Sequence, residues 1–274
     1  MRKDFDMLKF SYTTMGTPDL DAYQAIDAAV EYGFQGVDLR VHSHKGELQL
    51  NSTEEEIDGI KAYAVKNNIA FPSLLCYNKV GEVGENESWS EMKDDILSHL
   101  KLAKKLNAES IRIFGGAPKV EEDYEQYLEN FIATLQEVID SDSSSINIIL
   151  QNHGGSFNFL QGVSLTQSIS RDRFGMCFSP DHCVMMDENW NDVLIAVPKY
   201  SKHMYFSDVK KYDEGYKGIL PGQGDVDLKI ATHAIKDSDF NGWISFKWEK
   251  IWQDHLPEYK VAFPEFFKLI KSII

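Results

Sequence analysis

The residues best suited to chemistry lie at the ends of two short apolar runs. The isoleucine-rich run INIIL at residues 146–150 ends in Gln151 and, two residues later, His153. A second run, WISFKW, contains Lys247 and is followed by Glu249. A lysine inside an apolar run is rare unless it reaches solvent or a partner. Imidazole, carboxylate and ammonium groups can transfer protons and stabilise developing negative charge, so His153, Glu249 and Lys247 are candidate catalytic residues.

Other polar residues follow the remaining apolar runs and are candidates for substrate binding. Arg40 lies in GVDLRV, Arg112 in SIRIF and Tyr205 in HMYF, while Asp181 and His182 follow FGMCF. The two arginines could orient a carboxylate or phosphate, or could pair with acidic neighbours at the rim of the site. His182 could bind substrate or cap a loop. Tyr205 could bind substrate or pack with its hydroxyl in contact with water.

Short apolar runs alternate with amphipathic segments along the chain, which predicts strands alternating with helices. Strands are predicted at residues 8–13, 36–41, 69–77, 110–114, 146–150, 174–178, 203–206 and 243–246. Helices are predicted at residues 18–32, 53–67, 90–106, 121–139, 162–170, 190–197, 228–235 and 264–273, with a long loop at 210–226. Thr53 and Glu56 form a predicted capping box.

Sustained alternation of this kind predicts an α/β protein with a parallel sheet covered by helices. Eight units in 274 residues, with no linker between them, favour one (β/α)8 TIM barrel domain over residues 1–274. An open, doubly wound sheet is less favoured, because no G-x-G-x-x-G motif follows the first strand. In such a barrel the functional residues lie at the C-terminal ends of the strands, where all the candidates above are found.

The composition limits the kinds of molecule that the protein is expected to bind and the cellular compartment in which it is expected. The net charge of −15 argues against sequence-independent binding of nucleic acid, although a small anionic substrate responds to local charge. The chain has three cysteines, Cys76, Cys177 and Cys183, and no C-x-x-C pair, which predicts free thiols in a reducing compartment. It has neither an N-terminal apolar signal segment nor an apolar stretch long enough to span a membrane. We therefore expect a cytoplasmic protein that does not associate with membranes.

Several longer segments resemble one known family. They are AAVEYGFQGVDLR, LNAESIRIFGG, LQNHGG, FSPDHCV and LPGQGDVDLKIATHAIKDSDFNGWISFKWE. Together they are similar to the xylose-isomerase-like TIM barrels, which comprise sugar and sugar-phosphate isomerases and epimerases, with apurinic endonucleases as distant relatives. The last segment resembles the glycine-rich loop, the seventh helix and the eighth strand of that family. The resemblance covers nearly the whole chain and implies a role in carbohydrate metabolism.

The resemblance also implies an atypical or absent metal site. Typical members hold one divalent metal with Glu on strand five, Asp on strand six, His on strand seven and Glu on strand eight. Here those positions fall on Gln151, Ser179, Tyr205 and Lys247. Lys247 would place an ammonium where the cation belongs, and its charge could replace part of the electrostatic role of the metal.

A displaced metal site is an alternative. His153, Asp181 and Glu249 each lie two residues beyond a substituted position, on the same predicted face of the barrel. They are of metal-ligand types and could hold Mn, Mg or Zn, or they could instead contact sugar hydroxyls or neighbouring side chains. No cofactor is therefore certain.

Two functions from different classes fit these observations. The first is an isomerase or epimerase acting on a small carbohydrate or sugar derivative, with His153 and Glu249 as acid–base groups and Lys247 as electrophile. Further substrate contacts would come from Arg40, Arg112, Gln151, Asp181, His182 and Tyr205. The second is a non-catalytic carbohydrate-binding or partner subunit. DNA repair is disfavoured, since neither a multi-metal cluster nor a basic face is visible.

A homo-oligomer is also conceivable. Trp248, Trp252 and the aromatic segment 263–267 could form a dimer surface, although packing in the core explains them as well.

Overall fold

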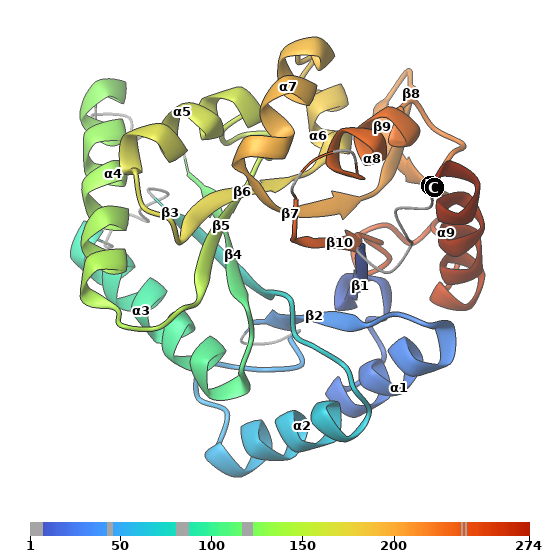
Figure 1. Cartoon of the computed structure of the whole chain (residues 1–274), viewed down its shortest axis with the longest axis horizontal. Helices are drawn as coiled ribbons and strands as arrows, with labels where there is room; N and C mark the ends of the chain where they lie inside the picture. Colours follow the sequence, from blue (N-terminus) through green and yellow to red (C-terminus); the bar gives the residue numbers. More distant parts are fainter. Residues whose placement is uncertain (1–7, 43–45, 81–87, 117–122, 237, 239) are drawn as a thin grey trace.

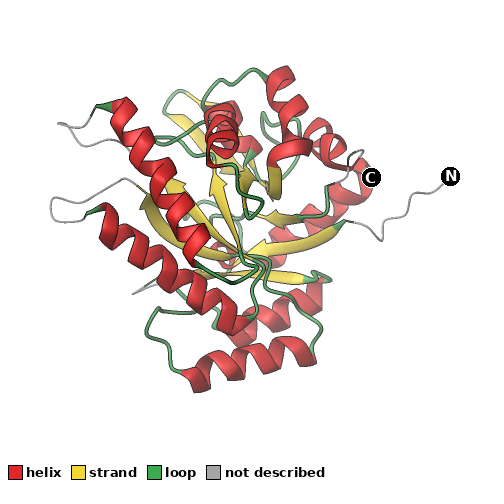
Figure 2. Cartoon of the chain, turned by 60° about the vertical axis from the view of Figure 1, so that its left-hand side comes forward, coloured by secondary structure: helices red, strands yellow, loops and turns green. Residues whose placement is uncertain are grey.

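Eight parallel strands form the centre of the molecule, and helices surround them (Figures 1 and 2). The structure is a computed structural model that describes residues 8–42, 46–80, 88–116, 123–236, 238 and 240–274. The strands follow one another around the ring in chain order, and the last pairs with the first. They are β1 (Lys9–Thr13), β2 (Gly36–Val41), β3 (Leu74–Val80), β4 (Ser110–Gly115), β5 (Asn147–Gln151), β6 (Phe174–Phe178), β7 (Ser201–Phe206) and β10 (Trp243–Phe246). The predicted (β/α)8 barrel is therefore confirmed.

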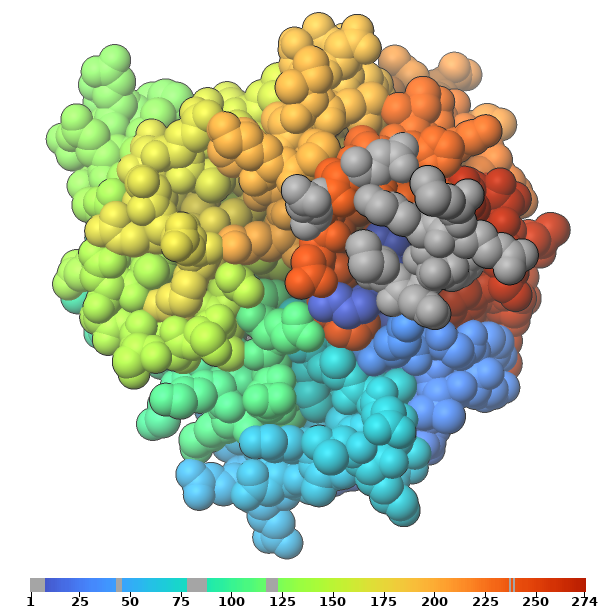
Figure 3. Space-filling model, viewed as in Figure 1, coloured from blue at the N-terminus to red at the C-terminus, as the bar shows by residue number. Residues whose placement is uncertain are grey.

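The helices connect successive strands and cover the outside of the barrel (Figure 1). They are α1 (Ala22–Tyr32), α2 (Glu54–Lys66), α3 (Trp89–Leu106), α4 (Tyr124–Ser141), α5 (Phe159–Ile169), α6 (Pro180–Met185), α7 (Trp190–Tyr200), α8 (Leu228–Lys236) and α9 (Tyr259–Ile273). The blue N-terminal units lie against the red C-terminal units, which closes the ring (Figure 3). None of the helices among the described residues has the length and apolar character needed to cross a membrane.

Capping residues fix where several helices begin. The predicted capping box is confirmed: Thr53 accepts the backbone N–H of Glu56, whose carboxylate accepts the backbone N–H of Thr53. Ser88 and Glu91 form the same arrangement at the start of α3. Each box satisfies two N–H groups that have no partner within the helix, so the strand-to-helix loops end at defined residues.

The interior of the barrel is largely apolar in its middle layer and polar nearer the N-terminal ends of the strands. A middle layer packs Leu75, Ile149, Cys177 and Tyr205 together with Met15. Interiors of this fold are usually filled with bulky branched side chains, and this layer follows that pattern in part. All three cysteines are buried and unpaired, as predicted.

Below this layer, towards the N-terminal ends of the strands, lies a buried polar network. His203 Nε2 lies 2.6 Å from Ser245 Oγ and 3.3 Å from Asp38 Oδ2. Ser11 contacts both Ser245 and Asp38 through its hydroxyl. Because these side chains are partnered with one another, the base of the barrel tolerates polar groups that would otherwise be costly to bury.

The aromatic residues near the C-terminus belong to the core. Phe263 and Phe266 of α9 are buried, and the Phe266 ring stacks on Phe34 and Phe246. Trp248 is also buried, and its indole N–H donates to the carbonyl of Pro257. Core packing, and not a dimer surface, therefore explains these three residues.

Three predicted boundaries are wrong. The segment 210–226 is not a continuous loop, because β8 (Asp208–Tyr212) and β9 (Gly215–Ile219) form an antiparallel hairpin there. Most of its residues are exposed or only partly buried, so it lacks the apolar pattern by which strands are recognised. The third strand begins at Leu74, and α9 begins before Pro264 because its buried aromatic face compensates for the hydrogen bond that proline removes.

Asp208 holds the glycine-rich loop that follows the hairpin. Its buried carboxylate accepts the backbone N–H groups of Gly222 (2.8 Å), Gly224 (2.9 Å) and Val226 (3.2 Å). A Cβ atom on Gly224 would lie 2.2 Å from Asp208 Oδ1, so glycine is required for this approach. The loop is thereby fixed beside the C-terminal end of the barrel.

We predict that Asp208→Ala lowers the free energy of unfolding by roughly 2–4 kcal/mol, because it leaves three loop N–H groups without their charged acceptor. Urea unfolding followed by circular dichroism measures the change. Asp213→Ala, at the exposed tip of the hairpin, is the control and should change stability little. Equal stability of the two variants would show that the carboxylate does not hold the loop.

Candidate functional site

A buried ion pair lies at the C-terminal mouth of the barrel. Lys247 follows β10, and its Nζ lies 2.7 Å from Asp181 Oδ2 and 3.5 Å from Glu249 Oε1. It also donates to Ser179 Oγ (3.3 Å), and that hydroxyl in turn donates to Asp181 Oδ1 (2.6 Å). The side chains of Lys247 and Asp181 are only 1% and 3% exposed. Four residues singled out in the sequence are thus brought together.

The chain between β5 and α6 fixes the position of Asp181. Pro180 is the first residue of α6, where a missing N–H is harmless, and it places Asp181 and His182 in the first turn. The side chain of Asn152 forms two hydrogen bonds with the backbone of Ser179, the residue before Pro180. Its Nδ2 donates to the carbonyl of Ser179, and its Oδ1 accepts the N–H of Ser179. The turn that carries Asp181 therefore has little freedom to move.

Both members of the pair are charged at neutral pH. Burial favours the neutral form of Asp181, but the Lys247 ammonium and hydrogen bonds hold its pKa below the usual range. Burial likewise favours a neutral lysine, but Asp181 and Glu249 raise the pKa of Lys247 above its ordinary value. Removing either partner of such a pair costs about 3–5 kcal/mol, because it leaves an uncompensated buried charge.

His153 and His182 lie next to each other above the pair, with ring centroids 4.2 Å apart. His153 Nδ1 lies 2.8 Å from the carbonyl of Gly154, which can only accept, so Nδ1 carries the proton and Nε2 has a free lone pair. The N–H of Gly154 donates to His182 Nδ1, which fixes the opposite tautomer in that ring. Burial and the Lys247 ammonium lower the pKa of both histidines, so both are neutral.

Arg112 and Arg40 differ in their partners. The guanidinium of Arg40 forms a buried ion pair with Glu47, whose carboxylate also accepts the backbone N–H of Arg40. Arg40 thus pairs with an acidic neighbour, which was the alternative to a role in binding a carboxylate or phosphate. Arg112 is 1% exposed and lies against the rings of Phe114 (4.0 Å) and Tyr77 (5.3 Å). Its Nε and Nη1 have no hydrogen-bond partner among the described residues.

The four positions that the resemblance assigns to metal ligands are occupied by residues that do not fit a metal. Gln151 and Tyr205 are buried, and burial raises the pKa of the Tyr205 hydroxyl well above its ordinary value, so it stays neutral. Ser179 is hydrogen-bonded to Asp181, and Lys247 brings a positive charge to the site. A divalent cation placed beside this ammonium would be repelled.

The predicted displaced metal site is not formed either. In the described part of the chain, no three His, Cys, Asp or Glu side chains come together as a metal-binding group. Asp181 and Glu249 instead contact the Lys247 ammonium, and the Nδ1 of His153 faces the carbonyl of Gly154.

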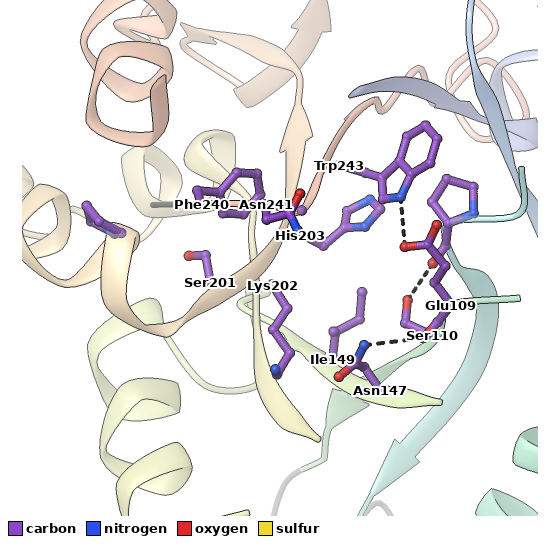
Figure 4. Close-up of a pocket in the computed structure, with 13 residues that line it drawn as sticks. Glu109, Ser110, Asn147, Ile149, Ser201, Lys202, His203, Phe240, Asn241 and Trp243 are labelled. Atoms are coloured by element: carbon purple, nitrogen blue, oxygen red, sulfur yellow. Dashed lines mark hydrogen bonds between the residues drawn. The ribbon is translucent and has the colours of Figure 1, made fainter. Parts of the chain in front are cut away.

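A separate cavity of about 280 Å³ lies at the opposite, N-terminal end of the barrel (Figure 4). Trp243 donates its indole N–H to Glu109, and the ring of His203 lies beside Trp243. Lys202 of β7 and Asn147 of β5 also line it. None of the candidate catalytic residues lines this cavity, so the C-terminal mouth is the candidate active site.

Three residues of the mouth were missed in the sequence. Glu47 lies in an irregular segment, and nothing in its neighbourhood indicates that it pairs with Arg40. Asn152 lies between two singled-out residues, but its side chain faces away from the barrel interior and secures Ser179. Phe114 supports both Arg112 and the ring of His153, with 4.9 Å between the two ring centroids, yet its type indicates only packing.

Comparisons with known proteins agree with this architecture. The family model described as xylose isomerase-like TIM barrel matches residues 26–263. Inosose isomerase from Bacillus velezensis is 23% identical over 235 residues, which cover 81% of this chain and 81% of that protein.

Two solved structures have the same fold. A crystal structure of an IolI protein with a bound zinc atom has a TM-score of 0.80 and 16% identity, and the match covers 97% of this chain and 98% of that one. D-psicose 3-epimerase in the presence of D-fructose has a TM-score of 0.74 and 12% identity, with 94% of each chain covered. At these identities the likeness establishes the fold and not the chemistry.

We predict that the imidazole of His153 titrates below its ordinary pKa of about 6.5 and that Lys247→Met raises this pKa, because a repelling ammonium is removed. Titration of the Cε1–H signals by NMR measures both values. Lys229→Met, an exposed lysine on α8, is the control and should leave His153 unchanged. A His153 pKa that stays the same or falls in Lys247→Met would mean that the ammonium does not face the imidazole.

Proposed function

The chain belongs to the xylose isomerase-like TIM barrel family, and we propose that it is an isomerase or epimerase that moves a proton on a small sugar, sugar phosphate or related polyol. The observation that carries this proposal is the buried Lys247 ammonium, held by Asp181 at the family position of a metal ligand and placed near a neutral histidine. A fixed positive charge and a neutral base are what removal of a proton beside a carbonyl requires.

In the proposed reaction, the base takes the proton from the carbon next to the substrate carbonyl. The electron pair of the broken C–H bond moves to the carbonyl oxygen, and an enediolate forms. Return of a proton to the former carbonyl carbon, with the proton of the adjoining hydroxyl transferred to the enediolate oxygen, gives the isomer. Return of a proton to the other face of the original carbon restores the carbonyl and gives the epimer. The Nε2 of His153 has the free lone pair needed for the first step, and Glu249, with its side chain 29% exposed, can serve as the second acid–base group.

Lys247 is suited to stabilise the enediolate oxygen. An ammonium has three N–H donors, and here two are directed at Asp181 and Ser179. The third can interact with Glu249 or with a substrate oxygen. Because Asp181 and Glu249 raise the pKa of Lys247 even against the effect of burial, the group stays charged and does not act as a base.

The relatives support a polyhydroxy carbonyl compound as the substrate class. The names of two of them, inosose isomerase and D-psicose 3-epimerase, describe the interconversion of such compounds. Gln151, His182 and Tyr205 would then contribute further substrate contacts at the mouth, together with Arg112.

A second candidate function is a non-catalytic carbohydrate-binding or partner subunit. The observation in its favour is that all four family ligand positions are substituted, at Gln151, Ser179, Tyr205 and Lys247. Such a protein would bind a sugar at the mouth without turnover.

We predict that Lys247→Met and Glu249→Gln each slow proton exchange by about 10²-fold or more, since each removes a group that acts in the transition state. The assay follows deuterium incorporation from D₂O next to the carbonyl of D-fructose, D-psicose, D-tagatose, an inosose and D-fructose 6-phosphate. Lys229→Met is the control. Unchanged exchange in both site variants would refute these roles. No exchange with any compound, together with thermal stabilisation by one of them, would favour the non-catalytic alternative.

We also predict that the exchange rate survives dialysis against EDTA, because the ammonium supplies the positive charge that a metal would otherwise provide. The rate is measured before and after dialysis and again after addition of Mn²⁺, Mg²⁺ or Zn²⁺. Loss of exchange on dialysis and its return with one ion would show that a metal acts at the mouth.

A further inference from the structure

Arg112 is a buried cation that the described chain leaves without a counter-ion. It is 1% exposed, and two of its three nitrogens, Nε and Nη1, are buried with no hydrogen-bond partner. The rings of Phe114 and Tyr77 cover the guanidinium, and no carboxylate among the described residues forms an ion pair with it. At the same end of the barrel, the hydroxyl of Tyr77 also lacks a partner in the described chain. The Tyr205 side chain interacts with Arg112, but it is neutral and supplies no negative charge.

This arrangement is unfavourable in the free protein. A buried charge without a partner costs several kcal/mol, and rings beside a guanidinium return only part of this. The chain shows the usual solution at Arg40, where Glu47 neutralises the charge. At Arg112 no described residue supplies a compensating charge, so the position is suited to a bound ligand that carries negative charge.

We propose that the substrate is a polyhydroxy or keto carboxylate and that Arg112 binds its carboxylate group. The inference that this carboxylate is a substrate rests on the proposed function, whereas the inference that Arg112 binds it does not. Because aromatic rings cover the faces of the guanidinium, a ligand would approach its edge, where either Nε–H or Nη1–H can pair with an N–H of Nη2. A planar carboxylate matches such an edge through parallel hydrogen bonds.

The charges at the mouth favour a carboxylate over a phosphate dianion. Arg40 is paired with Glu47, and Lys247 with Asp181 and Glu249. With Arg112, and with Asp208, which lines the same cavity as Lys247, these groups amount to three cations and four carboxylates, so the described mouth has no surplus of positive charge. A single negative charge at Arg112 is therefore matched locally, whereas a second would face the carboxylates of Asp181 and Glu249.

Arg112 also lies where it can position the reacting carbon. Phe114 lies between the guanidinium, 4.0 Å from its ring, and the ring of His153, whose centroid is 4.9 Å away. The contacts of Phe114 with the guanidinium and with the His153 ring place Arg112 near His153. The charges of Lys247 and, less strongly, of Arg112 add to burial in lowering the pKa of His153. A carboxylate held at Arg112 would direct the adjoining carbons towards His153 and Lys247.

The binding test uses two probes that differ only at one end. D-gluconate has a carboxylate where D-glucitol has a hydroxymethyl group, and both keep the other hydroxyls. Isothermal titration calorimetry should show gluconate binding at least about tenfold tighter than glucitol and tighter than inorganic phosphate. Arg112→Met should abolish this difference, while Arg171→Gln, which removes a surface arginine paired with Asp140, should preserve it.

The second test measures stability without any ligand. Arg112→Met removes an unpaired buried charge and keeps an apolar stem of similar length, so the melting temperature should stay the same or rise. Arg40→Met leaves the buried carboxylate of Glu47 unpaired and should lower it by roughly 5 °C or more. This matched pair also shows whether Arg112→Met folds.

Gluconate binding no tighter than that of glucitol, or unaffected by Arg112→Met, overturns the proposal. A large loss of stability in Arg112→Met, similar to that of Arg40→Met, overturns it as well, because it shows that the charge already has a partner. Tighter binding of phosphate overturns the choice of carboxylate. None of these measurements needs turnover, so an inactive protein that binds gluconate through Arg112 would refute the proposed isomerase and leave the carboxylate site standing.

Discussion

The mouth of this barrel is organised around a lysine ammonium that is almost wholly removed from water. A buried ammonium must be neutralised, and Asp181 does this at 2.7 Å. That requirement fixes much of the surrounding structure, because Asp181 must stay charged and must not move. Ser179 therefore donates to it, and Asn152 holds the turn at the start of α6 through two backbone hydrogen bonds. The neutral state of His153 and His182 follows from burial beside the same ammonium.

The architecture could be predicted from the sequence because it depends on local signals. Alternating apolar runs and capped amphipathic segments such as Thr53–Glu56 specify strands and helices, and eight repeats leave few topologies other than the closed barrel. The hairpin of β8 and β9 gave no such signal, since most of its residues are exposed or only partly buried.

The sequence indicated which residues lie at the mouth, but not which of them form ion pairs with one another. Strand ends identified Lys247, Asp181, Glu249 and His153, because every strand of a parallel barrel directs its C-terminal end to the same mouth. Contacts between strands that are not neighbours depend on barrel geometry, so the pairing of Lys247 after β10 with Asp181 after β6 is absent from any local pattern. The contrast between Arg40 and Arg112 is hidden for the same reason. Both lie within apolar strands, and only the path of the segment that carries Glu47 separates them.

Replacing a metal by lysine changes what else the site must provide. A divalent cation with open coordination positions can bind two substrate oxygens and so orient the substrate as well as stabilise charge. The ammonium of Lys247 directs two donors at Asp181 and Ser179 and has one left, which can hold a single oxygen but cannot fix its orientation. A second anchoring group is then needed at a distance from the reacting carbons. Arg112, with its buried and unpartnered nitrogens, has the charge and the position for that role. Under the proposed function, the lysine at the metal position and the uncompensated arginine have a common explanation, as two parts of a site that would orient its substrate without chelation.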